Sequence, residues 1–117
     1  MEHITWNDFE KVELRVGTII EVHDFPKARK PAFKMKIDFG EFGIKWSSAQ
    51  ITKHYTKEGL IGRQVIAVIN FPEKQIADFM SQCLLTGLPI PTEILYLPRL
   101  TNYCLTEPSF VNTTPLL

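Results

Sequence analysis

The sequence contains no apolar run that approaches the roughly 20 residues of a membrane-spanning helix. Its first five residues, Met-Glu-His-Ile-Thr, also lack the charged and then apolar segments of a secretory leader. We therefore expect a cytoplasmic protein that does not insert into a membrane.

Residues suited to metal binding or covalent chemistry are few and scattered. Cys83 and Cys104 have no C-x-x-C or C-x-x-H neighbourhood, and His3, His23 and His54 have no acidic partner at ligand spacing. The G-x-S-x-G, Walker A and G-x-G-x-x-G motifs are absent. We predict no disulfide framework, no metal, no cofactor and no enzymatic activity, although a catalytic set assembled from distant residues leaves no such motif.

Net charge is also absent, since 13 Lys and Arg balance 13 Asp and Glu. The positive charge is nevertheless segregated, because five cations fall in a ten-residue window without an acid: Lys27, Arg29, Lys30, Lys34 and Lys36. Such a cluster is typical of a surface that binds a polyanion, and equally of a solvated loop and strand face.

Apolar residues alternate with polar ones along much of the chain, as in half-buried strands. This pattern predicts strands over 12–22, 33–39 and 44–47, a strand buried on both sides over 65–69, and a fifth strand over 79–85. Gly17 predicts a bulge or bend in the first strand. Gly40 to Gly43 predicts a hairpin connection, and a short basic loop with Lys74 leads to the fifth strand.

Two helical segments complete the pattern. Thr5 or Asn7 is a candidate N-cap for a short N-terminal helix, and 50–55 is a helical or turn segment in the middle of the chain. Five short strands with a bent first strand predict an all-β protein, a small five-stranded OB-fold barrel with a short N-terminal helix and a mid-chain helical insertion. A β-sandwich fits the same strand count.

The character of the sequence changes after Gly87. Residues 88–117 hold five of the eight prolines, none of the six glycines and one basic residue, Arg99. Only Ile94 to Leu97 is apolar and proline-free enough to form a strand there. We divide the chain into a core, 1–87, and an altered C-terminal segment, 88–117, which completes or wraps the barrel.

Several motifs resemble those of the tRNA-binding OB domains found in methionyl-tRNA synthetases and EMAP II-like cofactors, and most closely the CsaA-type secretion chaperones. They lie at 8–19, 25–34, 37–40, 47–52 and 70–81. The resemblance implies an OB-fold homodimer described both as a tRNA-binding module and as an export chaperone for unfolded preproteins. The family usually has Ser-Glu where this chain has Ser81-Gln82.

The resemblance stops at Gly87. Beyond it the family expects an Asn-Gly turn, a last strand and a Pro-Asn-Gly-Thr-Lys ending. When residues 88–117 are translated back into codons and these are read one base out of phase, such an ending is permitted. We interpret 88–117 as a frameshift product, with a natural tail as the alternative.

Binding residues follow from the basic pattern and from the resemblance, which implies the last four. The nucleic-acid-binding candidates are Lys34, Lys36, Lys45, Lys53, Arg63, Asn70, Lys74, Ser81 and Gln82. Trp46 is a candidate stacking ring or a half-buried barrel residue.

Two functional hypotheses remain. One is a dimer that binds tRNA or other structured RNA by shape and backbone. The other is a holdase for unfolded preproteins with no physiological RNA ligand, which needs an apolar groove, and its peptide-binding candidates are Phe33, Phe71 and Met80. The alternating pattern explains Phe33 equally well as a core residue.

Overall fold

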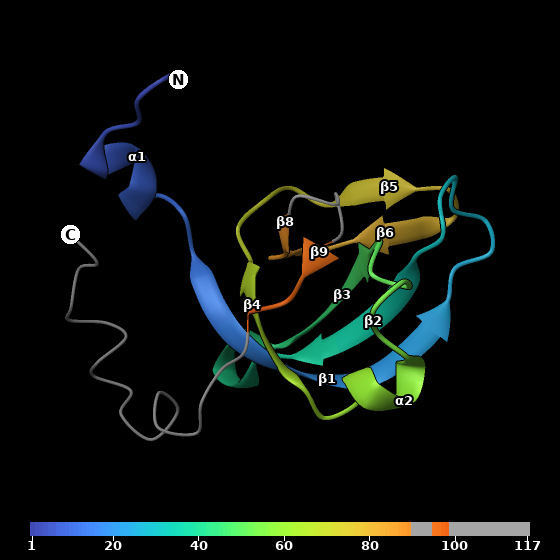
Figure 1. Ribbon diagram of the computed structural model, residues 1–117. Helices are drawn as coiled ribbons and strands as arrows, with labels where there is room; N and C mark the ends of the chain where they lie inside the picture. The colour runs from blue at the N-terminus through green and yellow to red at the C-terminus, as the bar shows by residue number, and fades with distance from the viewer. Residues whose placement is uncertain (90–94, 99–117) are drawn as a thin grey trace.

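The computed structural model of the chain describes residues 1–89 and 95–98. Five strands form one antiparallel sheet in the order β3-β2-β1-β4-β7, and the sheet curls on itself (Figure 1). The strands are β1 (Leu14–Asp24), β2 (Phe33–Asp38), β3 (Ile44–Ala49), β4 (Gln64–Val68) and β7 (Leu84–Leu85). Long β1 lies at the centre and pairs with β2 along its second half and with β4 along its first.

The two outer strands of the sheet, β3 and β7, come together and nearly close a barrel. The backbone N of Gln82, just before β7, donates to the Trp46 carbonyl of β3 at 2.7 Å. The Ser47 hydroxyl donates to the Cys83 carbonyl at 2.9 Å. A curled sheet whose edges meet is a barrel, and the structure confirms the predicted all-β OB-like fold over the sandwich.

The barrel interior follows from strand alternation, because successive side chains point to opposite faces. Phe33, Met35 and Ile37 of β2 are buried, whereas the intervening Lys34 and Lys36 point outward. The core also contains Ile19, Leu60, Val65 and Ala67. Strand β4 is half-buried at Ile66, so the prediction of a strand buried on both sides is wrong there.

Gly17 and the bulge in β1 are separate features. The register of β1 against β2 shifts between Ile19 and Glu21, so the bend lies beyond the glycine rather than at it. Gly17 instead provides space: a Cβ there would lie 2.5 Å from Ile37 Cγ2 and 2.7 Å from the Phe39 ring. The glycine lets the core side chains approach the β1 backbone closely.

Within residues 1–89 and 95–98 both α-helices are short and begin at a threonine cap. Helix α1 (Trp6–Glu10) starts at Thr5, whose hydroxyl accepts from the Asp8 N–H while the Asp8 carboxylate accepts from the Thr5 N–H. Helix α2 (Lys57–Leu60) starts at Thr56. The mid-chain helical insertion therefore exists, but it lies after 50–55, which contains turns only. A 3-10 turn, η1 (Gly40–Phe42), joins β2 to β3.

A small hairpin replaces the expected basic loop and the first half of the expected fifth strand. Strands β5 (Lys74–Ile76) and β6 (Phe79–Ser81) pair with each other, and β6 lies near β3. Its turn contains Ala77 with a φ of 55°, a conformation that is uncommon for a residue with a Cβ. The predicted strand 79–85 is thus two strands, β6 and β7, interrupted at Gln82 and Cys83.

The described part of the C-terminal segment contacts the barrel through Leu97. Strand β9 (Leu95–Tyr96) pairs with β8 (Leu88–Pro89) in a separate two-stranded sheet. Leu97 is 5% exposed and belongs to the core, and its backbone N donates to the Tyr55 hydroxyl at 3.0 Å. The expected strand near 94–97 therefore forms, although it pairs with β8 rather than with the barrel sheet; Ile94 and 99–117 lie outside the described residues. No helix in the described ranges is long and apolar enough to cross a membrane.

Candidate functional site

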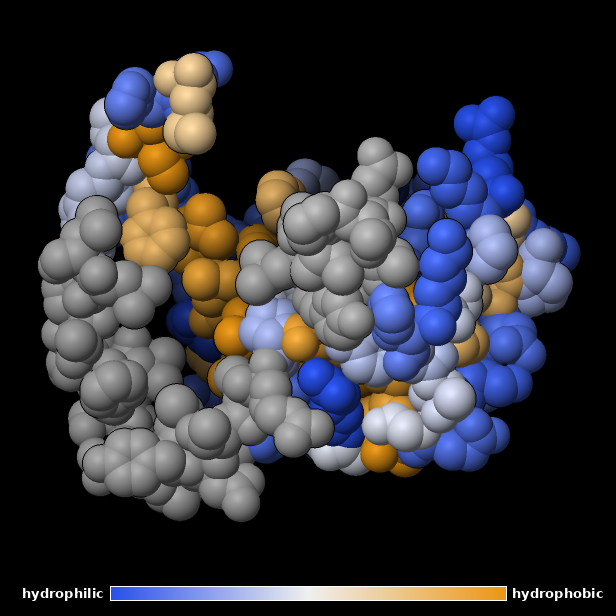
Figure 2. Space-filling model, viewed as in Figure 1, coloured by the Kyte–Doolittle hydropathy of each residue, from blue (hydrophilic) through white to orange (hydrophobic). Residues whose placement is uncertain are grey.

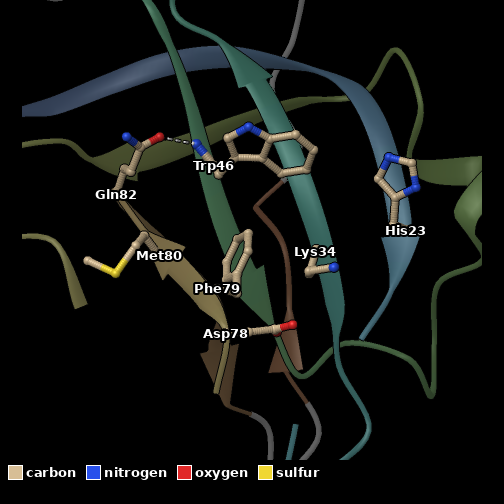
Figure 3. A pocket seen from close by; sticks show the side chains of 7 residues that line it. All are labelled: His23, Lys34, Trp46, Asp78, Phe79, Met80 and Gln82. Atoms are coloured by element: carbon tan, nitrogen blue, oxygen red, sulfur yellow. Dashed lines mark hydrogen bonds between the residues drawn. The ribbon is translucent and has the colours of Figure 1, made fainter. Parts of the chain in front are cut away.

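A pocket of about 480 Å³ opens on the outer surface where β1, β2 and β3 meet the β5–β6 hairpin. Figure 3 shows the Trp46 indole between Gln82 on one side and His23 on the other, with the Phe79 ring nearby. We call this site the Trp46 pocket; it is lined by His23, Lys34, Trp46, Asp78, Phe79, Met80 and Gln82.

Sheet register explains why side chains far apart in sequence meet here. His23 of β1 pairs with Lys34 of β2, and Lys34 pairs with Ser48 of β3. In the neighbouring row, Glu21 pairs with Lys36 and Lys36 with Trp46. Paired residues point to the same face of a sheet, so these two rows share the outer face of the barrel.

Aromatic rings form the walls of the pocket. The Trp46 and Phe79 rings meet edge to face, with centroids 6.1 Å apart and an interplanar angle of 86°. Phe79 also packs against buried Phe25 with centroids 5.4 Å apart, which fixes the hairpin on the barrel. The result is a half-exposed aromatic surface held in place from below.

Lys34 lies among these rings and has no salt bridge to any described residue. Its Nζ is 5.4 Å from the centroid of Phe25 and 5.8 Å from that of Phe79, within the range of a cation–π contact. The ammonium group therefore borders the pocket with its charge available to an anion.

Lys36 is anchored at the edge of the pocket. Its Nζ lies 3.1 Å from Glu21 Oε2 and 5.9 Å from the Trp46 ring centroid. Glu21 Oε1 also lies 3.2 Å from His23 Nε2. The hydrogen bond from Lys36, followed by that from His23, lowers the pKa of Glu21 below its ordinary value. Glu21 therefore stays ionised and holds two basic side chains on this face.

A second ion pair fixes the hairpin turn to the loop between β1 and β2. Lys27 Nζ lies 2.9 Å from Asp78 Oδ2. The hydrogen bond from Lys27 lowers the pKa of Asp78, and the charge of Lys34 adds a smaller effect in the same direction. Asp78 thus presents an ionised carboxylate at the rim of the pocket.

Gln82 lines the pocket beside the backbone of Trp46. Its Oε1 accepts from the Trp46 backbone N at 2.9 Å (Figure 3), and its Nε2 lies 3.3 Å from Glu73 Oε2. Both ends of the amide are therefore engaged within the fold, and Gln82 supports the site more than it offers groups to a ligand.

The other basic candidates are dispersed. Lys45 lies on β3 one residue before Trp46, and alternation places it on the same face as buried Ser47, opposite the pocket. Lys53 is exposed in the segment between β3 and α2. The Arg63 guanidinium lies over the Tyr55 ring at 5.1 Å and its Nη2 is 3.4 Å from the Leu97 carbonyl, so it underlies the C-terminal segment.

The four positions implied by the family resemblance also separate. Asn70 binds backbone on both sides, accepting from the Glu13 N at 3.0 Å and donating to the Lys11 carbonyl at 2.6 Å, so it links β4 to the start of β1. Lys74 and Ser81 are paired across the β5–β6 hairpin. Of the nine nucleic-acid candidates, only Lys34 and Gln82 line the pocket directly.

The three peptide-binding candidates do not form one groove. Phe33 is 7% exposed in the core, because β2 alternation turns it inward, so its assignment to an accessible groove is corrected. Phe71 is 55% exposed after β4, and Met80 is 44% exposed in the Trp46 pocket.

Three residues of the pocket were not singled out from the sequence. His23 carries no motif, and it reaches the pocket because the bulge sets the register at the end of β1. Asp78 and Phe79 depend on the hairpin turn at Ala77, which has no glycine or asparagine to signal it. The described residues include no group of three His, Cys, Asp or Glu side chains arranged for a metal ion.

Comparison with known proteins adds three findings. A family model described as a putative tRNA binding domain matches residues 14–94. The methionine–tRNA ligase of Leptospira biflexa is 42% identical over 82 residues, which are 70% of this chain and 12% of the ligase. The methionine–tRNA ligase of Thermococcus kodakarensis is 35% identical over 85 residues, which are 73% of this chain and 11% of the ligase. The chain thus spans about an eighth or less of these enzymes.

The third finding concerns solved structures. A CsaA chaperone protein from Picrophilus torridus is 50% identical, with a TM-score of 0.79 over 84% of this chain and 91% of the other. A chaperone CsaA from Bacillus anthracis is 44% identical, with a TM-score of 0.76 over 86% of this chain and 93% of the other.

Proposed function

The chain belongs to the tRNA-binding domain family, in a form similar to the CsaA chaperones, and from this premise we propose that it binds tRNA or other structured RNA around the Trp46 pocket. The family predicted from the sequence motifs is therefore confirmed. The family is a binding domain rather than a catalytic one, and the ligases match it only over a small part of their length.

One observation carries the proposal: Lys34 and Lys36 stand side by side on the outer face of β2, each next to an aromatic ring of the pocket. Neighbouring phosphate-binding cations and base-stacking rings are what looped or single-stranded nucleic acid requires. The exposed Arg29 and Lys30 extend this basic surface along the β1–β2 loop. Figure 2 shows hydrophilic side chains gathered at this end of the molecule.

The test is a titration with total tRNA at several salt concentrations. Lys34→Ala with Lys36→Ala is expected to weaken binding and to flatten the plot of log affinity against log salt, by about 0.7 to 0.9 per lost phosphate contact. Lys11→Ala with Lys57→Ala is the matched control, since it removes the same charge away from the pocket. Equal slopes for the two double variants would show that Lys34 and Lys36 face solvent and do not contact phosphate.

A second candidate function is the holding of unfolded preproteins for export, which the similarity to two chaperone structures favours. Phe71 and Met80 are the exposed apolar candidates for such contacts. This activity rests on apolar burial, so binding of a reduced, unfolded polypeptide should depend weakly on salt. Binding of the polypeptide without binding of tRNA would favour this function over the first.

We also propose that the protein acts in the cytoplasm as a homodimer. Helix α1 projects from the barrel (Figure 1), and none of its residues is buried. Ile4, Trp6 and Val12 are 70%, 43% and 40% exposed, and Figure 2 shows apolar side chains facing the hollow between α1 and the barrel. A second copy would cover this surface. Sedimentation of Trp6→Asp beside the wild type tests the proposal, which predicts a shift toward monomer.

The division at Gly87 and the frameshifted origin of 88–117 are likewise proposals. The division rests on the change of composition after Gly87, and the frameshift rests on the missing family ending and on the out-of-phase codon reading. The family match continues to residue 94. Resequencing the source gene is the test: a coding sequence with no inserted or missing base near the Gly87 codon identifies a natural tail. The altered tail leads us to expect a weaker dimer than one with the restored ending, which sedimentation of both chains measures.

A further inference from the structure

Three kinds of group converge in the Trp46 pocket, and each suits a different part of one nucleotide. Half-exposed Trp46 and Phe79 offer aromatic surface, Lys34 offers a positive charge, and Asp78 offers a carboxylate. They come from β2, β3 and the hairpin, so only the folded barrel brings them together. The volume of about 480 Å³ falls within the range of about 300–1,000 Å³ that small-molecule sites occupy.

The aromatic part of the pocket fits a planar ring. Trp46 and Phe79 meet edge to face, and His23 lies at a centroid distance of 6.0 Å from Trp46 with an interplanar angle of 31°. Every nucleobase has a π-face that stacks on such rings, which makes stacking tolerant of sequence. The rings alone therefore predict a bound base without selecting one.

The carboxylate of Asp78 adds selection. An ionised carboxylate only accepts hydrogen bonds and has about four lone-pair positions, and Lys27 uses Oδ2. A base that turns an amino group toward Asp78 gains a hydrogen bond. Uracil carries a carbonyl oxygen where cytosine carries its amino group, so a carboxylate that faces this position is repelled.

The positive charge completes the fit. Lys34 has no salt bridge in the described part of the chain, unlike Lys27 and Lys36, which are paired with Asp78 and Glu21. A cation without a salt-bridge partner among the described residues, at the wall of an aromatic pocket, suits the phosphate attached to a stacked nucleotide.

We propose that the Trp46 pocket binds one unpaired nucleobase that carries an exocyclic amino group, with Asp78 as its acceptor and Lys34 on its phosphate. The base stacks on one ring of the perpendicular Trp46–Phe79 pair and meets the other ring edge-on. This inference rests on the proposed RNA-binding function. It goes further, because the pocket would prefer some bases over others, whereas the rest of the site recognises only the shape and backbone of the RNA.

The probes are oligocytidylate and oligouridylate of equal length. Cytosine carries an amino group at the position where uracil carries a carbonyl oxygen. Wild-type protein is expected to bind oligocytidylate at least about fivefold tighter, the lower end of discrimination by one base contact. In a Trp6→Phe background, the remaining Trp46 fluorescence should fall on binding. Asp78→Asn should reduce the preference to near unity while tRNA affinity falls little, because phosphate contacts dominate affinity.

Lys27→Ala is the matched control, since it breaks the same ion pair and leaves the carboxylate in place. Its preference for oligocytidylate should persist. Loss of preference in both variants would mean that the ion pair only positions the hairpin, and would overturn the proposal. Equal binding of the two oligonucleotides by a wild-type protein that binds tRNA would overturn this inference alone, whereas failure to bind tRNA would overturn the proposed function with it.

Discussion

Gln82 engages both backbone polar groups of Trp46: its N–H donates to the Trp46 carbonyl at 2.7 Å, and its side-chain Oε1 accepts from the Trp46 N–H at 2.9 Å. A neighbouring strand would normally supply both bonds. Here one residue supplies them, one bond through its backbone and one through its side chain. The Gln82 amide therefore adds a side-chain bond to the seam between β3 and the segment before β7, beside the Ser47–Cys83 bond, and it also lines the Trp46 pocket.

Replacing this amide should separate its structural from its binding role. Gln82→Leu leaves the part-buried Trp46 N–H without its acceptor and should lower the free energy of unfolding by about 1 kcal/mol, toward the lower end of the cost of an unmade hydrogen bond. Gln82→Glu keeps an acceptor but places a carboxylate about where Nε2 now meets Glu73, so it should weaken RNA binding and leave the barrel folded. Urea denaturation and RNA titration of both variants check this. A large loss of stability in Gln82→Glu would contradict it.

Gly17 should tolerate no side chain. Gly17→Ala would place a Cβ 2.5 Å from Ile37 Cγ2, and overpacking of this kind typically costs about 1–3 kcal/mol. Urea denaturation should show a lower midpoint with an unchanged dependence on urea concentration. A midpoint equal to that of the wild type would mean that the core side chains move aside without cost.

The ion pairs of Glu21 should make stability depend on acid pH. Lys36 and His23 lower the folded-state pKa of Glu21 from the ordinary 4.5. Ionised Glu21 therefore contributes fully to the free energy of unfolding above pH 4.5, and this contribution is lost as the pH falls through the folded-state pKa. The stability difference between wild type and Glu21→Gln should be present at about pH 7 and should shrink as the pH is lowered below 4.5.

The size of this difference should be small and should shrink in salt, because Glu21 and Lys36 are partly exposed. Glu41→Gln is the control, a glutamate of η1 that forms no ion pair in the described ranges. A difference that grows as the pH falls would contradict the assignment.

Cys83 should be unreactive while the barrel is folded. Burial raises the pKa of its thiol to about 11, and the thiolate is the reactive form. Iodoacetamide at mildly alkaline pH should label the Cys83 peptide slowly in native protein and quickly in urea, as mass spectrometry resolves. Equal rates in the two states would show that the β3–β7 seam opens readily.

The sequence was sufficient for the parts of the fold that alternation governs. Four strands and the inward or outward direction of Lys34 and Met35 follow from the period of two, and Thr5 was a recognisable cap. The hairpin β5–β6 was not predictable, because strands of three residues are too short to show a period and Ala77 gives no turn signal.

The candidate site was predictable only in its basic half. Lys34 and Lys36 stood out as unopposed charge, whereas Asp78 and Phe79 reach the pocket through tertiary contacts with Lys27 and Phe25. Asn70 was expected at the binding surface from the family resemblance and Arg63 from its charge, and the structure places them against backbone and against the C-terminal segment. Residue type indicates what a side chain can do, and only packing decides where it is.

The burial of Leu97 in the same core as Ile19 has a consequence for how quickly the chain folds. One core joins a residue of the first strand to a residue of the last described segment, and β1 pairs with β4 across the whole β2–β3 region. Loop-closure entropy is lost before such distant contacts form, so barrels of this kind fold in milliseconds to seconds rather than microseconds. During that interval the apolar side chains of β1 and β2 lack their distant partners, and the nascent chain is itself an aggregation-prone, unfolded polypeptide.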